Sequence, residues 1–185
     1  MSNNASPFPF KGWKGNQYEG GIKTPMIMTW KNKIKSNTKF DGFISALDIF
    51  KTSLEVSNVN DDLMVNADGK NIMNYINQNT IQNENLFWRK DKMATVRSGN
   101  YKLIKLNDTS TVLYNIENNY FEDLDLKLVE PSVHDSLFKL LSSWEDRLID
   151  PNWIENKDWN IVTEMIYEDL MANKDIRAVS PKDLN

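Results

Sequence analysis

Between residues 86 and 114 the sequence carries four short segments of strand-forming residues, each separated from the next by turn-forming residues. The segments are residues 86–88, 93–97, 101–105 and 112–114, and the breaks are Asp91, Ser98 to Asn100 and Asn107 to Ser110. Strands joined by such short turns pair antiparallel, since parallel pairing needs a connection of a dozen or more residues. This region therefore predicts a four-stranded antiparallel meander.

Helical spacing of apolar residues flanks this meander on both sides. After it, one amphipathic helix is expected from Pro131 to about Leu148 and another over about 158–173. Before it, the spacing predicts a helix from about Ser45 to Val56, with Ser45 or Asp41 as the cap, and one or two helical turns over 71–76.

The first thirty residues are expected to form a loop followed by one buried strand. Residues 1–24 concentrate Pro and Gly, whereas Thr24 to Trp30 is a nearly continuous apolar run. Such a run is typical of a strand covered on both faces in a parallel or mixed sheet. We therefore predict an α/β protein that is α+β in its C-terminal part, with one or two elements of a larger mixed sheet beside the small antiparallel one.

Composition excludes several classes of function. The 185 residues include no Cys and a single His, so a thiolate nucleophile, a disulfide, Cys-ligated zinc and a His cluster for a metal are absent. A net charge of −4 argues against nucleic acid or an acidic membrane surface as a partner. The sequence has no apolar stretch long enough for a membrane span and no signal peptide at Met1, so as written the chain would stay in the cytoplasm.

Residues 11–25 form a Gly-rich loop that contains Lys11, Lys14 and Lys23. A Lys flanked by Gly brings an ammonium close to an oxyanion, because the glycines let the backbone approach it. The composition fits a solvated basic loop as well, since the spacing of a phosphate-binding P-loop is absent.

The order of residues 14–25, K-G-N-Q-Y-E-G-G-I-K-T-P, resembles the K-G-x-x-x-E-G-G-x-R-x-P signature of type I sulfatases. These are the formylglycine-dependent sulfuric ester hydrolases of the alkaline phosphatase superfamily. Further similarities follow in register over about residues 3–153, at Trp30 to Ile34 (W-P-G-K-I), Ser45 to Thr52 (S-x-L-D-L-F-P-T), Asp68 to Ile72 (D-G-x-D/N-L), Phe87-Trp88 (F-W), Ala94 to Ile104 (A-V-R-x-G-x-W-K-L-I) and Leu113 to Asn115 (L-Y-D).

The sequence departs from the family pattern at four positions. Lys23 replaces an Arg and so loses a bidentate fork, while Lys31, Asn32 and Lys51 replace Pro, Gly and Pro. These changes are expected to make the turns less stiff without changing the identity of the family.

The resemblance implies that the chain is the C-terminal portion of a sulfatase. The family's nucleophile is a Cys or Ser in a C/S-x-P-S/A-R motif, which is absent here, and its late metal ligands, an Asp-Asn pair, would precede Met1. Calcium and formylglycine are therefore expected only in an N-terminal part. The expected domains are a catalytic-domain remnant over 1–78, a sheet-plus-helix subdomain over 86–149 and a helical tail over 150–185.

By the same resemblance, Lys14 is expected to contact the substrate sulfate. Tyr18, Glu19, Gly20 and Gly21 are expected to shape the loop and hold it against the sheet, and no metal site is expected.

The implied function is hydrolysis of a sulfate ester on a sulfated carbohydrate or an aryl group, with this chain inactive until an N-terminal sulfatase segment joins it. The parent family is usually periplasmic, secreted or lysosomal, which leaves the compartment open. One alternative is a non-catalytic remnant or interaction module, in which Pro25 to Trp30 is buried if the chain is self-sufficient and exposed if it needs a partner sheet. Another is a related phosphoester or phosphonate hydrolase.

Several other residues are expected to have structural roles alone. His134 is expected at the surface, and the acidic residues Glu122, Asp123 and Asp125 in a solvated loop rather than a calcium site. Three tryptophans, Trp144, Trp153 and Trp159, are expected to pack in the core or between helices.

Overall fold

A computed structural model describes residues 9–57, 67–76 and 85–184. By its internal contacts the chain forms two compact units, one of residues 1–24 with 85–185 and the other of residues 25–84. The elements are α1 (Glu19–Ile22), α2 (Ala46–Val56), α4 (Ile72–Ile76), β1 (Asn85–Lys90), β2 (Met93–Ser98), β3 (Tyr101–Lys105), β4 (Thr111–Asn115), α5 (Pro131–Glu145), α6 (Lys157–Met171) and the 3₁₀ helix η1 (Pro181–Leu184). The expected domain boundaries refer to a parent enzyme and stay a prediction.

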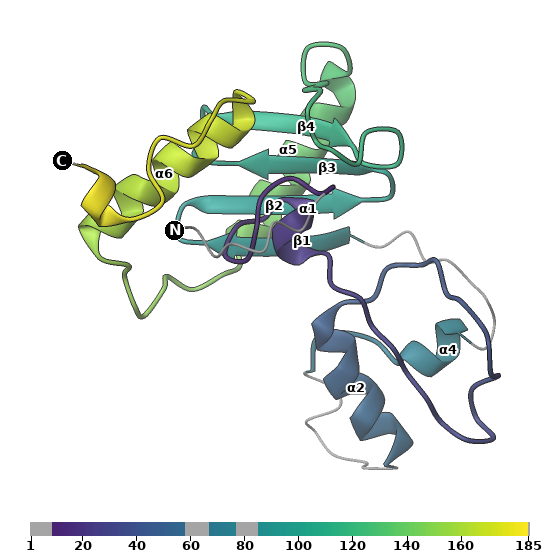
Figure 1. Cartoon of the computed structure of the whole chain (residues 1–185). Helices are drawn as coiled ribbons and strands as arrows, with labels where there is room; N and C mark the ends of the chain where they lie inside the picture. The colour runs from purple at the N-terminus through teal and green to yellow at the C-terminus, as the bar shows by residue number, and fades with distance from the viewer. Residues whose placement is uncertain (1–8, 58–66, 77–84, 185) are drawn as a thin grey trace. The chain divides into compact units, whose positions relative to one another are not determined.

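The first unit is built on one sheet in the order β1-β2-β3-β4, with every neighbouring pair antiparallel (Figure 1). Phe87 pairs with Val96, Val96 with Leu103 and Leu103 with Leu113 across the sheet. The tight turns use residues with positive φ, Asp91 at 50° and Gly99 at 54°. The predicted meander is confirmed.

Both faces of this sheet are covered. Helix α5 packs Leu137 and Leu141 on one face, where the Trp144 ring also stacks on Phe87 with centroids 4.9 Å apart. The other face carries α6 and the N-terminal loop, which meet in an apolar cluster that includes Tyr18 and Tyr167. In Figure 1, α5 lies behind the strands, and α6 and α1 lie in front of them. The two helices predicted after the meander are thus confirmed.

The second unit contains α2 and α4, and side chains of α2 accept hydrogen bonds from the backbone at the start of α4. Ser45 and Asp48 form a reciprocal capping box at the start of α2. The Asp48 carboxylate also accepts from the backbone N–H of Lys70 at 2.9 Å. Thr52 Oγ1 accepts from the backbone N–H of Ile72 at 2.8 Å, which joins the two helices. Both predicted helices of this region are confirmed.

The buried strand predicted from Thr24 to Trp30 is wrong. These residues are outside any strand, and Ile27 is 94% exposed. The reason is that a doubly covered strand needs neighbours to pair with, and among the described residues every strand belongs to the four-stranded sheet. The mixed α/β class and the small antiparallel sheet with its helices are confirmed.

The turn after this segment explains one departure from the sulfatase pattern. Asn32 has a φ of 63°, in the left-handed region that Gly adopts freely and Asn tolerates better than most residues. The backbone N–H groups of Lys33 and Ile34 both donate to the Trp30 carbonyl. Asn therefore keeps the turn where the family has Gly.

No described helix combines the length and the apolar character that crossing a membrane requires.

Candidate functional site

The loop of residues 11–23 crosses one face of the sheet and folds back on itself (Figure 1). The backbone N–H of Gly20 donates to the Lys11 carbonyl at 2.8 Å, which closes the loop. Gly21 lies so close to the chain that a Cβ there would come within 2.0 Å of the Asn16 carbonyl oxygen. Any larger residue at position 21 therefore forces this backbone crossing apart.

Tyr18 and Gln17 fasten the middle of the loop to the sheet and to α6. Tyr18 is fully buried, with its ring centroid 6.2 Å from that of Tyr114 and 6.0 Å from that of Tyr167. The backbone N–H of Gln17 donates to the Tyr167 hydroxyl at 2.9 Å, and the Gln17 side chain bridges Thr95 and the Met93 carbonyl. The apolar stacking and the hydrogen bonds together fix this part of the backbone.

Glu19 anchors the end of the loop through buried charges. Its carboxylate lies 3.0 Å from the Lys102 ammonium and 3.7 Å from the Arg97 guanidinium. Glu122 completes the arrangement, since its carboxylate lies 2.8 Å from the same ammonium and accepts from the Glu19 backbone N–H at 2.8 Å. We call Glu19, Arg97, Lys102 and Glu122 the charged anchor. Lys102 and Glu122 are fully buried.

Burial perturbs the titration of this anchor. Loss of solvent raises the pKa of Glu122, although Lys102 and the Glu19 N–H favour its charged form. Burial likewise lowers the pKa of Arg97 and of Lys11, against the attraction of nearby carboxylates. The Lys11 ammonium donates to the Glu122 carbonyl at 2.8 Å, which ties the start of the loop to the same point.

Lys14 lies apart from these anchors. It is exposed, and among the described residues its ammonium has no ion-pair partner. It borders a cavity of about 300 Å³, which we call the Lys14 cavity. The lining residues are Trp13, Lys14, Gly15, Asn16, Lys90, Glu155, Trp159, Thr163, Ile166, Tyr167 and Val179.

Of the predicted site residues, the structure therefore brings Tyr18 and Glu19 into buried contacts and uses Gly20 and Gly21 to close the loop. It leaves Lys14 exposed at a cavity. The roles of these residues toward a substrate stay predictions. The described residues contain no cluster of acidic and His side chains able to hold a metal ion.

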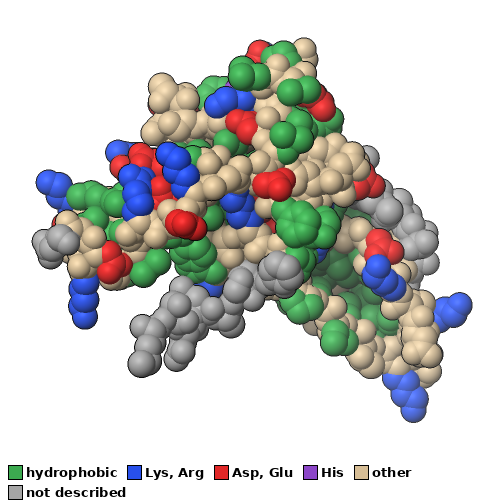
Figure 2. Space-filling model, turned by 45° about the horizontal axis from the view of Figure 1, so that its top comes forward, with side chains coloured by type: hydrophobic (Ala, Val, Ile, Leu, Met, Phe, Trp, Pro, Cys, Tyr) green, Lys and Arg blue, Asp and Glu red, His purple; other side chains and the backbone are tan. Residues whose placement is uncertain are grey.

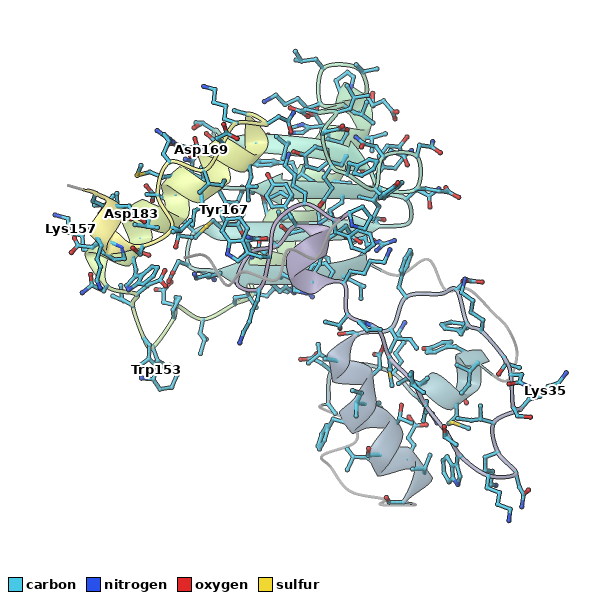
Figure 3. All side chains as sticks on the ribbon, in the orientation of Figure 1. Lys35, Trp153, Lys157, Tyr167, Asp169 and Asp183 are labelled. Atoms are coloured by element: carbon cyan, nitrogen blue, oxygen red, sulfur yellow. The ribbon has the colours of Figure 1, made fainter. Side chains whose placement is uncertain are left out.

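Three of the other sequence expectations are wrong, those for Glu122, Trp153 and His134. Glu122 was expected in a solvated loop but is buried, because the Lys102 ammonium and the Glu19 N–H replace its water. Its neighbour Asp125 accepts from the Leu113 backbone N–H, so this acidic segment caps the edge of the sheet. Trp153 was expected to pack in the core but is 87% exposed, and it points away from the sheet in Figure 3.

The other two tryptophans differ in burial. Trp144 packs as predicted, while Trp159 is 44% exposed. His134 is half-buried rather than at the surface, with its Nε2 2.9 Å from the Thr111 hydroxyl. Burial of Lys102 was missed. The available signal was strand alternation, which places Lys102 on the face opposite Leu103, toward the loop.

Solved structures share this fold. The crystal structure of Ps i-CgsB in complex with k-i-k-neocarrahexaose superimposes with a TM-score of 0.72 at 23% identity, over 83% of this chain and 36% of the other. The structure BT33336S-sulf, described with the metabolism of multiple glycosaminoglycans by Bacteroides thetaiotaomicron, gives 0.60 at 21% identity, over 70% and 30%. The chain therefore shares its fold with about a third of each of these larger structures.

Sequence relatives match part of the chain, and both are sulfatases. An uncharacterized sulfatase of Escherichia coli K12, YdeN, is 35% identical over 81 residues, which are 42% of this chain and 14% of YdeN. Human steryl-sulfatase is 44% identical over 43 residues, 23% of this chain and 7% of the relative. No family model matches the chain. The chain is therefore a homologue of part of a sulfatase, consistent with the C-terminal portion.

Proposed function

We propose that this chain supplies the Lys14 loop to a sulfatase active site and releases sulfate only together with a sulfatase segment that carries the nucleophile and the metal ligands. The observation that supports it most is that the loop is anchored on both sides while Lys14 is left exposed at a cavity. An ammonium held in this way neutralises charge on a sulfate as the ester bond breaks.

The anchors matter because electrostatic stabilisation is strongest when the charge is already in place before the reaction. Lys14 lies three residues before Gln17 and five before Glu19, both of which are buried. The backbone that carries Lys14 therefore has little freedom, whereas its side chain is free to reach an anion.

The nucleophile and the metal ligands are assigned to the separate sulfatase segment that would join this chain. The 185 residues contain no Cys and no C/S-x-P-S/A-R motif, so the formylglycine nucleophile belongs there. By the resemblance to the sulfatase family, calcium is assigned there as well. We propose a sulfated carbohydrate or an aryl sulfate as the substrate. Two neighbours are described with a neocarrahexaose and with glycosaminoglycans, and one relative is a steryl-sulfatase.

A second candidate function is a non-catalytic interaction module. It is supported by the exposed apolar side chains of the second unit, among them Met26, Ile27, Leu47, Ile49 and Phe50. Exposed apolar residues of this kind indicate that another protein surface binds here, whether the chain acts in a split sulfatase or as an interaction module. The two candidates differ in whether the assembled partners hydrolyse a sulfate ester.

The test measures sulfate release from 4-nitrocatechol sulfate in the presence of calcium. The chain is assayed alone and with an N-terminal sulfatase segment, in wild-type form and as Lys14→Ala. The matched control is Lys139→Ala, which removes an exposed Lys from α5 on the other face of the sheet. We expect activity only in the mixture, with a loss of about 100-fold in Lys14→Ala and none in Lys139→Ala.

Three results contradict the proposal. Activity of the chain alone shows that the nucleophile has been assigned to the wrong segment. Equal activity of Lys14→Ala and wild type in the mixture shows that Lys14 does not contact the sulfate. Binding of the two segments without sulfate release leaves the interaction module as the function.

A further inference from the structure

We propose that the Lys14 cavity binds the sugar ring of a sulfated saccharide, with Trp13 and Trp159 against the ring and Lys14 and Lys90 near its anionic and hydroxyl groups. This inference rests on the proposed function in one respect, the assignment of Lys14 to the sulfate. It narrows the proposed substrate from a sulfated carbohydrate or an aryl sulfate to a sulfated saccharide alone.

The aromatic residues of the cavity are the first observation. Trp13 borders it from the loop and Trp159 from the first turn of α6, two segments that are far apart in the sequence. Trp159 is 44% exposed although it lies on a helix that packs against the sheet. An exposed indole beside a cavity offers an apolar face, which matches the C–H face of a pyranose ring.

The charges around the cavity are the second observation. Lys90 and Glu155 line it as a pair with 3.4 Å between ammonium and carboxylate, and both side chains remain partly exposed. A sugar needs hydrogen-bond donors and acceptors together, since each hydroxyl both donates and accepts. An ammonium and a carboxylate side by side meet that need, whereas a cavity built for a bare anion gains nothing from the carboxylate of Glu155.

The size of the cavity agrees with this occupant. A volume of about 300 Å³ is at the lower end of the range found for small-molecule sites. It has room for a small saccharide but not for a long polymer, which would extend beyond it. The polar side chains of Asn16 and Thr163 complete a lining of mixed character.

The experiment measures binding to the whole chain by NMR of the tryptophan indole N–H groups, which number six. The probes are galactose 4-sulfate, galactose 6-sulfate, glucosamine 6-sulfate, unsulfated galactose, 4-nitrocatechol sulfate and inorganic sulfate. The variants are Trp159→Ala and Lys90→Gln. The matched control is Trp153→Ala, an exposed Trp that does not line the cavity.

We expect at least one sulfated hexose to shift the Trp13 and Trp159 signals but leave Trp153 unchanged. Trp159→Ala should weaken its binding about tenfold, as expected for loss of one aromatic contact, and Trp153→Ala should have no effect. Lys90→Gln keeps a polar group of similar length and serves as the second test if Trp159→Ala fails to fold. It should also weaken binding.

The proposal is overturned if no sulfated hexose shifts these signals, if inorganic sulfate binds as tightly as the sugars, or if 4-nitrocatechol sulfate alone binds. These outcomes are independent of the assay for sulfate release. Sugar binding without Lys14-dependent hydrolysis rejects the proposed function and keeps the assignment of the cavity. Lys14-dependent hydrolysis without sugar binding keeps the proposed function and rejects the assignment of the cavity.

Discussion

The loop of residues 9–24 and the second unit differ sharply in how they bury their side chains, although both resemble sulfatase sequences. Four consecutive loop residues, Asn16 to Glu19, are buried, whereas the buried residues among 25–57 and 67–76 are Thr52 and Ile72 alone. The loop packs against the four-stranded sheet and α6, and the charged anchor holds its end. Residues of the second unit form their helices from local signals and leave apolar side chains in solvent (Figure 2).

The difference teaches that local structure and burial have separate causes. A capping box and helical spacing are enough to start α2, because its hydrogen bonds are satisfied within a few residues. Burial of an apolar or charged face needs a partner surface, which for Glu19 lies 103 positions along the chain at Glu122. Four predictions test this contrast, beginning with the largest expected effect.

The largest effect is expected from Lys102→Ala, which removes the ammonium between two buried carboxylates. Glu19 and Glu122 are then left facing each other without Lys102, and breaking a buried pair in this way costs about 3–5 kcal/mol. We expect the free energy of unfolding of the first unit to fall by that amount in urea titrations. Lys139→Ala is the control and should change it by less than about 0.5 kcal/mol. A loss below about 1 kcal/mol for Lys102→Ala would mean that Arg97 and solvent replace its charge.

The charged anchor is a part of the fold that the sequence does not predict. The meander, the helices and the capping role of Ser45 follow from spacing and turn residues, which act over a few positions. The charged anchor joins residues 19, 97, 102 and 122, and nothing in their spacing shows that they meet. Glu122 in particular resembles any acidic loop residue until the Glu19 N–H and the Lys102 ammonium are placed beside it.

The candidate site likewise contains one residue that the sequence predicts and others that it does not. Lys14 was predicted through a motif, and its exposure agrees with the proposed role. The contribution of Trp159 and Lys90 to the same cavity was not predictable, because it depends on α6 and β1 packing beside the loop. A buried strand was predicted at Thr24 to Trp30 because an apolar run shows a need for partners without showing whether they are present.

A smaller effect is expected from Tyr167→Phe, which removes one hydroxyl and little else. The backbone N–H of Gln17 then loses its buried acceptor, and an unsatisfied buried donor costs about 1–3 kcal/mol. We expect a loss of unfolding free energy in that range together with faster hydrogen exchange at the Gln17 amide. Tyr101→Phe is the control, since that hydroxyl bonds the Glu130 carboxylate away from the loop and should leave Gln17 exchange unchanged. Unchanged Gln17 exchange in Tyr167→Phe would show that the apolar contacts of Tyr18 alone hold the loop.

The pH dependence of the charged anchor gives a third test, smaller still. Burial raises the pKa of Glu122, so the folded state binds its proton more readily than the unfolded state does. This group therefore contributes stability that is present below its ordinary pKa of 4.5 and is lost as the pH rises through the higher folded value. Between pH 7 and pH 4.5, acidification should shift the difference in unfolding free energy between wild type and Glu122→Gln in favour of wild type.

The control for this pH series is Glu164→Gln, which neutralises a half-exposed carboxylate of α6 that lies 3.8 Å from the Lys92 ammonium. Its difference from wild type should stay nearly constant over the same range. A shift of the Glu122→Gln difference in the opposite direction would show that Lys102 and the Glu19 N–H outweigh burial and lower the pKa of Glu122.

The smallest change in stability is expected from Phe50→Ser, and it tests the other side of the comparison. Phe50 lies on α2 with 54% of its surface exposed, so its replacement should change the unfolding free energy by less than about 0.5 kcal/mol. Ile72→Ala in the same unit removes a buried side chain and should cost about 2–5 kcal/mol. Equal losses for the two variants would show that Phe50 is covered in solution, and sedimentation would then identify a second copy as the cover. A stable Phe50→Ser chain that no longer joins a sulfatase segment would instead place that segment's contact on α2.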